Sequence, residues 1–258
     1  MPANLFSINR QPSPVAAFEP PAVSGADPRA QQEVEAGTES VRESDATEAT
    51  ANIVDDGYRS AIQRDYDRLL FSTPVRRLAD KTQVWPLDPN DGVRTRLTHS
   101  HEVANLARSI GTRVFKTAPG AFSGADLHEV IQPMLMAIGL AHDLGNPPFG
   151  HQGEAAIGNW FKERDWIFSR YHENGDGLPV AVPEVLKNEF IQFDGNPQSL
   201  RLLTQLQTSV GCVGLGLTAA TLAASLKYPV GASGLGPERR GRKKIGYFES
   251  ERHIVEWF

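Results

Sequence analysis

The chain has 258 residues, of which 40% are apolar and 22% charged, and its formal net charge at pH 7 is −5. This length and composition fit one substantial globular domain and exclude a fibrous protein. No apolar run approaches the roughly 18 residues of a membrane helix, and the first residues lack the basic and apolar regions of a signal peptide. The single cysteine, Cys212, excludes a disulfide framework and a thiolate metal cluster. We therefore expect a cytoplasmic protein with no membrane partner.

Residues 1–57 differ in composition from the rest of the chain. They carry ten acidic residues against three arginines, are rich in Pro, Ala, Ser and Glu, and contain few large apolar residues. Such a segment cannot bury enough apolar surface to offset the entropy lost on ordering. We expect a disordered acidic tail at 1–57 and a folded domain at 58–258.

From residue 58 onward the apolar residues recur at three- and four-residue steps, which predicts helices and almost no strands. A helix is expected over 99–115, with one apolar stripe formed by Val103, Ala107, Ile110 and Val114. The next, over 127–143, is apolar around most of its circumference and is therefore expected to be central and buried. It should end at Gly145-Asn146-Pro147-Pro148, because proline disfavours helix in the residue before it.

Further helices are expected in the second half of the domain. One begins near Gln152, and one follows Asn196-Pro197 with leucines at helical spacing. Another is capped by Thr218 and runs to about Tyr228, and Ser250 could cap a last one. Residues 170–183 are expected to form a Gly/Pro-rich loop. The predicted fold class is an all-α helical bundle that is incomplete at its C-terminus.

The dipeptide His142-Asp143 lies at the end of the helix expected to be buried. A carboxylate removed from water is costly unless it is paired or bound to a cation. A divalent metal held by this pair and a histidine of a neighbouring helix would resolve that cost. The alternative is a simple His-Asp hydrogen bond at a helix end, and residue chemistry alone favours this alternative while leaving the metal site open.

A longer pattern resembles the HD-domain phosphohydrolases, and within them the dGTP triphosphohydrolase family. The segments that carry the resemblance, in chain order, are 81–87, 93–100, 141–151, 193–201, 222–229 and 246–248. The resemblance covers about residues 58–258. It implies an HD-type helical domain that binds a divalent cation, Mg²⁺ or Mn²⁺.

The resemblance implies three metal ligands in this chain, His99, His142 and Asp143. The fourth ligand of the family is an aspartate on a later helix, and this chain stops before that helix. The chain also ends within a group of large apolar residues, Ile254, Val255, Trp257 and Phe258, that would open a further helix. We therefore expect a truncated domain that binds metal weakly and turns over substrate poorly.

His151 matches the family's catalytic histidine, and Glu154 matches the acid that orients it. Residues three apart on a helix share a face, which supports the pairing independently. Without the resemblance, Glu154 would be interpreted as an acid favoured near a helix start by the helix dipole.

The substrate-binding residues also follow from the resemblance. Arg96, three residues before His99 and so on the same side of a helical turn, resembles the arginine that contacts the triphosphate. Gln83 matches a glutamine that bonds the sugar 3′-hydroxyl; its alternative is a surface glutamine. Asp194 and Asn196 are expected as supporting groups of the substrate site.

The expected reaction is metal-dependent hydrolysis of dGTP or another dNTP to a deoxynucleoside and inorganic triphosphate. The alternatives are another HD-domain nucleotide phosphohydrolase and a truncated protein that binds nucleotide or single-stranded nucleic acid without turnover. The basic run 239–244 would suit the last of these, although such a run is more often a solvated loop. The resemblance also implies a homo-oligomer, commonly a hexamer.

Overall fold

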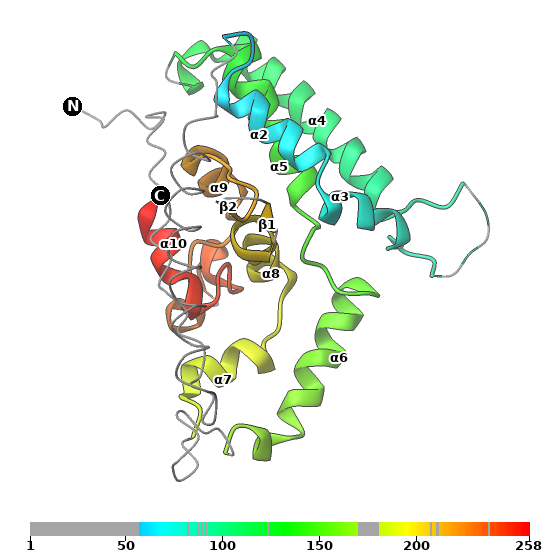
Figure 1. Cartoon of the computed structure of the whole chain (residues 1–258), viewed down its shortest axis with the longest axis vertical. Helices are drawn as coiled ribbons and strands as arrows, with labels where there is room; N and C mark the ends of the chain where they lie inside the picture. The colour runs from blue at the N-terminus through cyan, green and yellow to red at the C-terminus, as the bar shows by residue number, and fades with distance from the viewer. Residues whose placement is uncertain are drawn as a thin grey trace, which may run out of the picture.

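The computed structural model describes residues 57–81, 83–86, 88, 90, 92–122, 124–169, 181–206, 208–209, 212–236 and 238–258. The predicted acidic tail, apart from Gly57, and most of the predicted loop at 170–183 lie outside these residues. Within the described residues the regular elements are helices, apart from two strands of two residues each, which confirms the all-α fold class (Figure 1). None of the helices in this part of the chain is long and apolar enough to cross a membrane.

Three helices lie side by side in one part of the molecule, and α5 packs against the other two (Figure 1). They are α2 (Ala61–Leu70), α4 (Arg96–Thr117) and α5 (Gln132–Ala141). Short segments join them: α3 (Thr73–Arg77) and the 3-10 turns Leu78–Asp80 and Pro119–Phe122. Both α2 and α4 begin at a capping box, in which the Ser60 or Thr95 hydroxyl accepts a backbone N–H three residues on. The start of α4 therefore lies three residues before the predicted one.

The contact between α4 and α5 is too close for large side chains. A Cβ atom added at Gly139 of α5 would lie 2.4 Å from the Cα atom of Ala104 in α4. The face that α4 buries is accordingly small or polar: Arg96, Ser100, Ala104 and Gly111. The predicted apolar stripe of this helix was therefore wrong in part, because Ile110 is 63% exposed and Val103, Ala107 and Val114 are only partly buried.

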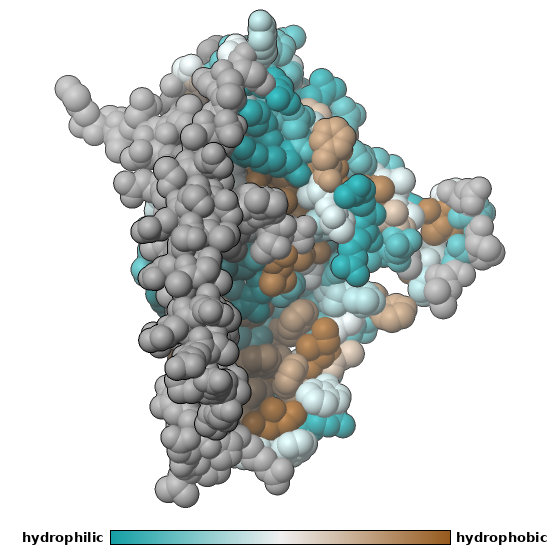
Figure 2. All heavy atoms as spheres, viewed as in Figure 1, coloured by the Kyte–Doolittle hydropathy of each residue, from teal (hydrophilic) through white to brown (hydrophobic). Residues whose placement is uncertain are grey.

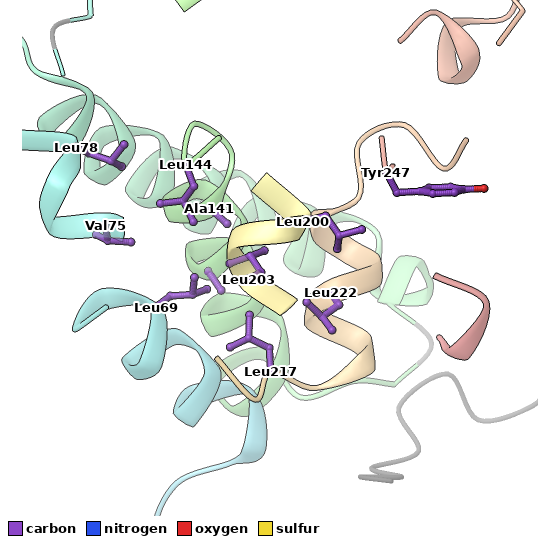
Figure 3. Packing of buried hydrophobic residues seen from close by; sticks show 11 residues of the cluster. Leu69, Val75, Leu78, Ala141, Leu144, Leu200, Leu203, Leu217, Leu222 and Tyr247 are labelled. Carbon is purple, nitrogen blue, oxygen red and sulfur yellow. The ribbon is translucent and has the colours of Figure 1, made fainter. Parts of the chain in front are cut away.

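The central helix α5 is shorter than predicted, because residues Leu127–Ile131 form a π-helical turn before it. Asp126 caps this turn, and hydrogen bonds from the backbone N–H groups of Glu129 and His128 lower the pKa of its carboxyl. The C-terminal half of α5 lies in the main hydrophobic core, as predicted. Figure 3 shows this core, which joins α2 and α3 to α5, α8 and α9; its members include Leu69, Val75, Leu78, Ala141, Leu200, Leu203 and Leu222.

A second group of elements follows the Asn146-Pro147-Pro148 segment: α6 (Gly150–Lys162), the 3-10 turn Asp165–Ile167 and α7 (Glu184–Ile191). They pack through the rings of Phe161, Phe168 and Phe190, whose centroids lie 5.0–6.0 Å apart. Figure 2 shows hydrophobic residues gathered between α6 and α7. This packing fixes α6, which carries His151 and Glu154.

The remaining elements are short. Helix α8 (Gly195–Arg201) continues as a π turn (Leu202–Leu206), and β1 (Thr208–Ser209) pairs antiparallel with β2 (Cys212–Val213). Helix α9 (Ala219–Ser225) is capped by Thr218 as predicted, but it ends three residues before Tyr228. After 3-10 turns at Ala232–Gly234, Arg240–Arg242 and Glu249–Glu251, the chain ends in α10 (Arg252–Trp257). The predicted Ser250 cap was wrong: Glu251 precedes α10 without a side-chain cap, and Ser250 Oγ instead accepts a hydrogen bond from Arg201.

Three glutamates meet where α7 packs near the C-terminal turn. Glu189 is buried, and one of its carboxylate oxygens accepts the backbone N–H of Glu249 at 2.6 Å. Burial raises the pKa of Glu189, and repulsion by Glu249 and Glu251 adds to this, while the Glu249 N–H and Arg201 oppose it. The folded state therefore bears a penalty for the ionised Glu189 carboxylate.

We expect Glu189→Gln to raise the free energy of unfolding at pH 7 by up to about 1 kcal/mol, because the amide oxygen keeps the bond from Glu249 and carries no charge. An acid with a raised folded-state pKa penalises the fold above that pKa and ceases to do so below its ordinary value, near 4.5. The advantage of the variant should therefore shrink as the pH falls toward that value. Urea unfolding of both proteins at several pH values measures it, and a difference independent of pH would contradict it.

Candidate active site

The first turn of α4 and the end of α5 bring three potential metal ligands together. One ligand atom from each of His99, His142 and Asp143 lies within 4.8 Å of the others. The two imidazole rings are 5.3 Å apart between centroids and meet edge to face. The predicted convergence of these residues is therefore confirmed, across more than forty residues of chain between His99 and His142.

Hydrogen bonding prepares His142 to act as a ligand. Its Nδ1 atom lies 2.7 Å from the carbonyl oxygen of Gly139, which can only accept, so Nδ1 carries the proton. The lone pair is then on Nε2, which lies 3.4 Å from a carboxylate oxygen of Asp143. A backbone acceptor that fixes the tautomer in this way is typical of metal-ligating histidines. Two imidazoles and a carboxylate suit a divalent first-row cation that accepts nitrogen and oxygen.

Asp143 is held by two donors from different parts of the chain. Arg96 donates from Nη1 to Oδ2 at 2.7 Å, and Asn146 donates from Nδ2 to Oδ1 at 2.6 Å. Both Arg96 and Asp143 are buried, so the ion pair compensates the cost of removing this carboxylate from water. Arg96, expected to contact a triphosphate, thus pairs with the carboxylate of a candidate metal ligand.

The loop that follows Asp143 is anchored on both sides. Lys81 donates to the carbonyl oxygen of Asn146 at 3.0 Å, and Ser199 Oγ accepts the N–H of Gly145 at 2.9 Å. Burial lowers the pKa of Lys81, as do the nearby Arg96 and Arg77 charges, while Asp143 opposes them. Lys81 therefore links the segment that carries Gln83 to the loop that follows Asp143.

Helix α6 then begins through a left-handed turn. Phe149 and Gly150 have φ angles of 66° and 55°, and Phe149 is the only non-glycine residue of the described chain with a positive φ. A Cβ atom added at Gly150 would lie 2.6 Å from Nη2 of Arg96. Glycine at position 150 thus lets the start of α6 approach the Arg96–Asp143 pair.

His151 and Glu154 form a hydrogen-bonded pair on one face of α6. The Nδ1 atom of His151 lies 2.7 Å from Oε2 of Glu154, which agrees with the three-residue spacing seen in the sequence. Oε1 of Glu154 accepts the N–H of Gly195 at 2.8 Å, which fixes the carboxylate against the start of α8. Glu154 is buried, whereas the side chain of His151 is 82% exposed. A carboxylate that orients an accessible imidazole is an arrangement suited to proton transfer.

Lys244, which was not among the predicted site residues, lies beside this pair. Its Nζ atom lies 2.5 Å from Oδ2 of Asp194 and 3.8 Å from Oε2 of Glu154. Burial would lower the pKa of Lys244, but the hydrogen bond to Asp194 and the charges of Asp194 and Glu154 outweigh it, so the pKa is raised. The basic run 239–244 contained this residue, yet only the fold distinguishes Lys244 from its exposed neighbours.

Asp194 and Asn196, the other two predicted residues of the substrate site, bond to each other. Asp194 caps α8 by accepting the N–H of Asn196 at 2.9 Å, and the Asn196 amide also bonds its carboxylate. Asn196 lines the same cavity as His142 and Asp143, whereas Asp194 lines a smaller neighbouring cavity.

The larger cavity has a volume of about 650 Å³, within the range of small-molecule sites. Its lining includes Gln83, Arg96, His142, Asp143, His151 and Lys244. Gln83 is one of the lining residues, and its Oε1 atom is buried without a hydrogen-bond partner among the described residues. Burying an amide oxygen without a hydrogen-bond donor costs free energy. A ligand hydroxyl that donated to this oxygen would remove that cost.

Comparison with known proteins agrees with this geometry. Residues 96–176 match the HD domain, so the candidate metal ligands and the His151–Glu154 pair all lie within the matched segment. The chain is 41% identical over 200 residues to a deoxyguanosinetriphosphate triphosphohydrolase-like protein of Listeria monocytogenes, and 41% identical over 205 residues to one of Pseudomonas aeruginosa. It is 37% identical over 204 residues to a probable deoxyguanosinetriphosphate triphosphohydrolase of the latter organism.

These alignments cover 76–77% of this chain but only 40–43% of the relatives. The chain thus spans less than half the length of the relatives that it matches.

Proposed function

We propose that this HD-domain chain is a metal-dependent phosphohydrolase that converts dGTP, or another dNTP, to the deoxynucleoside and inorganic triphosphate. The observation that carries the proposal is one cavity lined by both His142-Asp143 of the metal-ligating group and the His151–Glu154 pair. The relatives named for dGTP hydrolysis support the choice of substrate.

His99, His142 and Asp143 would hold the cation, Mg²⁺ or Mn²⁺. Such a cation, when bound, lowers the pKa of a water molecule and neutralises charge on phosphate oxygens. Arg96 and Asn146 keep the Asp143 carboxylate oriented toward the two imidazoles. Each carboxylate oxygen that accepts one hydrogen bond retains a second lone pair for a cation.

His151 is the residue proposed to move a proton. Because its Nδ1 atom is directed to Glu154, its exposed Nε2 atom is the one that can exchange a proton with the substrate or with water. The Nε2 atom would either donate a proton to the 5′-oxygen of the leaving nucleoside or accept one from the attacking water. Glu154, fixed by the N–H of Gly195, sets the orientation of the ring.

Gln83 is proposed to accept the 3′-hydroxyl of the sugar, and Arg96, with Asp194 and Asn196 in support, to bind the triphosphate end of the substrate. Two observations support the role of Gln83: it lines the larger cavity, and its buried Oε1 atom has no hydrogen-bond partner among the described residues. The homo-oligomer and the binding of single-stranded nucleic acid stay predictions.

We expect Gln83→Ala to reduce the preference for dGTP over dideoxy-GTP by about 10-fold or more, because a site built to bond a hydroxyl rejects substrates that lack it. The ratio of kcat/KM for the two nucleotides measures this preference. The neighbouring Val84→Ala, at a side chain that is 70% exposed, is the matched control. An unchanged ratio in Gln83→Ala would return Gln83 to the interpretation of a surface glutamine.

The proposed reaction is tested by incubating the purified chain with Mn²⁺ or Mg²⁺ and each dNTP, and then separating the inorganic products. Triphosphate released together with deoxynucleoside supports the proposal. Pyrophosphate or phosphate as the product would indicate another HD-domain nucleotide phosphohydrolase. Nucleotide binding without any product would indicate a binding protein, and either result would overturn the proposal.

A further inference from the structure

We propose that Lys244 is a positioning residue that holds Glu154, and through it His151, in the orientation needed for proton transfer. The inference rests on the proposed function for its catalytic consequence but not for its geometry. Lys244 lies ninety residues after Glu154 in the sequence, in a segment whose other basic residues are exposed. Its effect on the His151–Glu154 pair can therefore be separated from that of the basic run as a whole.

Lys244 compensates the charge of two buried carboxylates. Glu154 and Asp194 are both buried, and the ammonium group of Lys244 lies between them, 3.8 Å from one carboxylate and 2.5 Å from the other. Two buried carboxylates that share no cation repel each other and each loses hydration. Without Lys244, Glu154 would keep only the Gly195 N–H and the exposed His151 ring, and rotation toward solvent would become favourable.

The fold determines the position of Lys244 through the buried backbone that follows it. On its C-terminal side Ile245 is almost fully buried, and the N–H of Gly246 donates to the carbonyl oxygen of Val230 at 2.9 Å. A Cβ atom added at Gly246 would lie 1.6 Å from the carbonyl oxygen of Tyr228, so the backbone passes here in close contact. Arg239, Arg240, Arg242 and Lys243, in contrast, are all exposed.

Lys244 also lies where two cavities adjoin. The cavity of about 650 Å³ and its neighbour of about 310 Å³ share three lining residues: His151, Glu154 and Lys244. These side chains therefore lie between the two spaces. A residue in this place can keep Glu154 directed at His151 rather than toward the smaller cavity, which is what a positioning role requires.

The experiment uses the whole 258-residue chain and needs neither metal nor turnover for its first readout. The Nδ1–H proton of His151, observed by NMR after histidine labelling and assigned by its loss in His151→Ala, reports the bond to Glu154. In Lys244→Met we expect this proton to exchange with water at least about 10-fold faster, because the carboxylate is no longer held. Lys244→Arg should restore slow exchange, and Lys243→Met, which removes the same charge one residue away, should leave it unchanged.

The second readout is turnover. If Lys244 positions Glu154, Lys244→Met lowers kcat by about 10-fold or more with a smaller change in KM, and Lys244→Arg recovers most of the loss. If Lys244 instead contacts only a substrate phosphate, KM rises, the His151 proton is unaffected, and the proposal is overturned. A chain without dNTP turnover would refute the proposed function, while the NMR comparison would still decide the role of Lys244.

A folding defect in Lys244→Met is controlled by the double variant Lys244→Met/Asp194→Asn. It removes the cation together with one of the two carboxylates that the cation serves, and it leaves Glu154 without its ammonium partner. Faster exchange of the His151 proton in this folded protein supports the proposal. Exchange at the wild-type rate overturns it.

Discussion

Replacing His142 with alanine is expected to weaken Mn²⁺ binding by more than about 100-fold, since loss of a ligand should exceed the 10–100-fold losses typical of residues that support ligands. Among the described residues, the Nδ1 atom of His142 bonds to a carbonyl oxygen of its own helix, and its ring lies against His99 and Asp143. Titration of the chain with Mn²⁺, followed by calorimetry or by the electron paramagnetic resonance of free Mn²⁺, measures the affinity.

The matched control for this variant is His101→Ala. His101 lies in the same helix turn as His99, is exposed, and is not part of the metal-ligating group. We expect His99→Ala to behave as His142→Ala does and His101→Ala to bind Mn²⁺ as the wild type. Equal affinities in all four proteins would rule out the His99, His142 and Asp143 site.

The sequence allowed much of this site to be predicted because its signals are local. Helix periodicity placed the central helix, and a three-residue spacing placed His151 beside Glu154. The family resemblance joined His99 to His142-Asp143, and the structure confirms that these residues meet. Prolines and capping residues placed several of the helix ends to within a few residues.

The features that could not be predicted depend on contacts between distant segments. The pairing of Arg96 with Asp143 spans 47 residues, and that of Lys244 with Glu154 spans 90, so neither has a spacing that a helix or turn would dictate. The apolar stripe of α4 was misjudged for the same reason. Periodicity identifies a possible buried face, but the close approach of Gly139 to Ala104 determines which face α5 covers.

Replacing His151 with alanine is expected to lower kcat for dNTP hydrolysis by about 10²-fold or more, the loss typical of a general acid–base group. Mn²⁺ affinity should stay close to that of the wild type, because His151 is not part of the metal-ligating group. Glu154→Gln should lower kcat as well. Its amide can still accept the Gly195 N–H, but it carries no charge to hold the His151 ring or to pair with Lys244.

Parallel measurement of kcat, KM and Mn²⁺ affinity in one preparation separates proton transfer from metal binding. His128→Ala is the control. His128 is an exposed histidine in the π-helical turn Leu127–Ile131 before α5, and its ring bonds to Gln132. A His151→Ala protein that loses Mn²⁺ affinity along with turnover would assign His151 to the metal site. One that retains full turnover would rule out the proposed role of His151 in proton transfer.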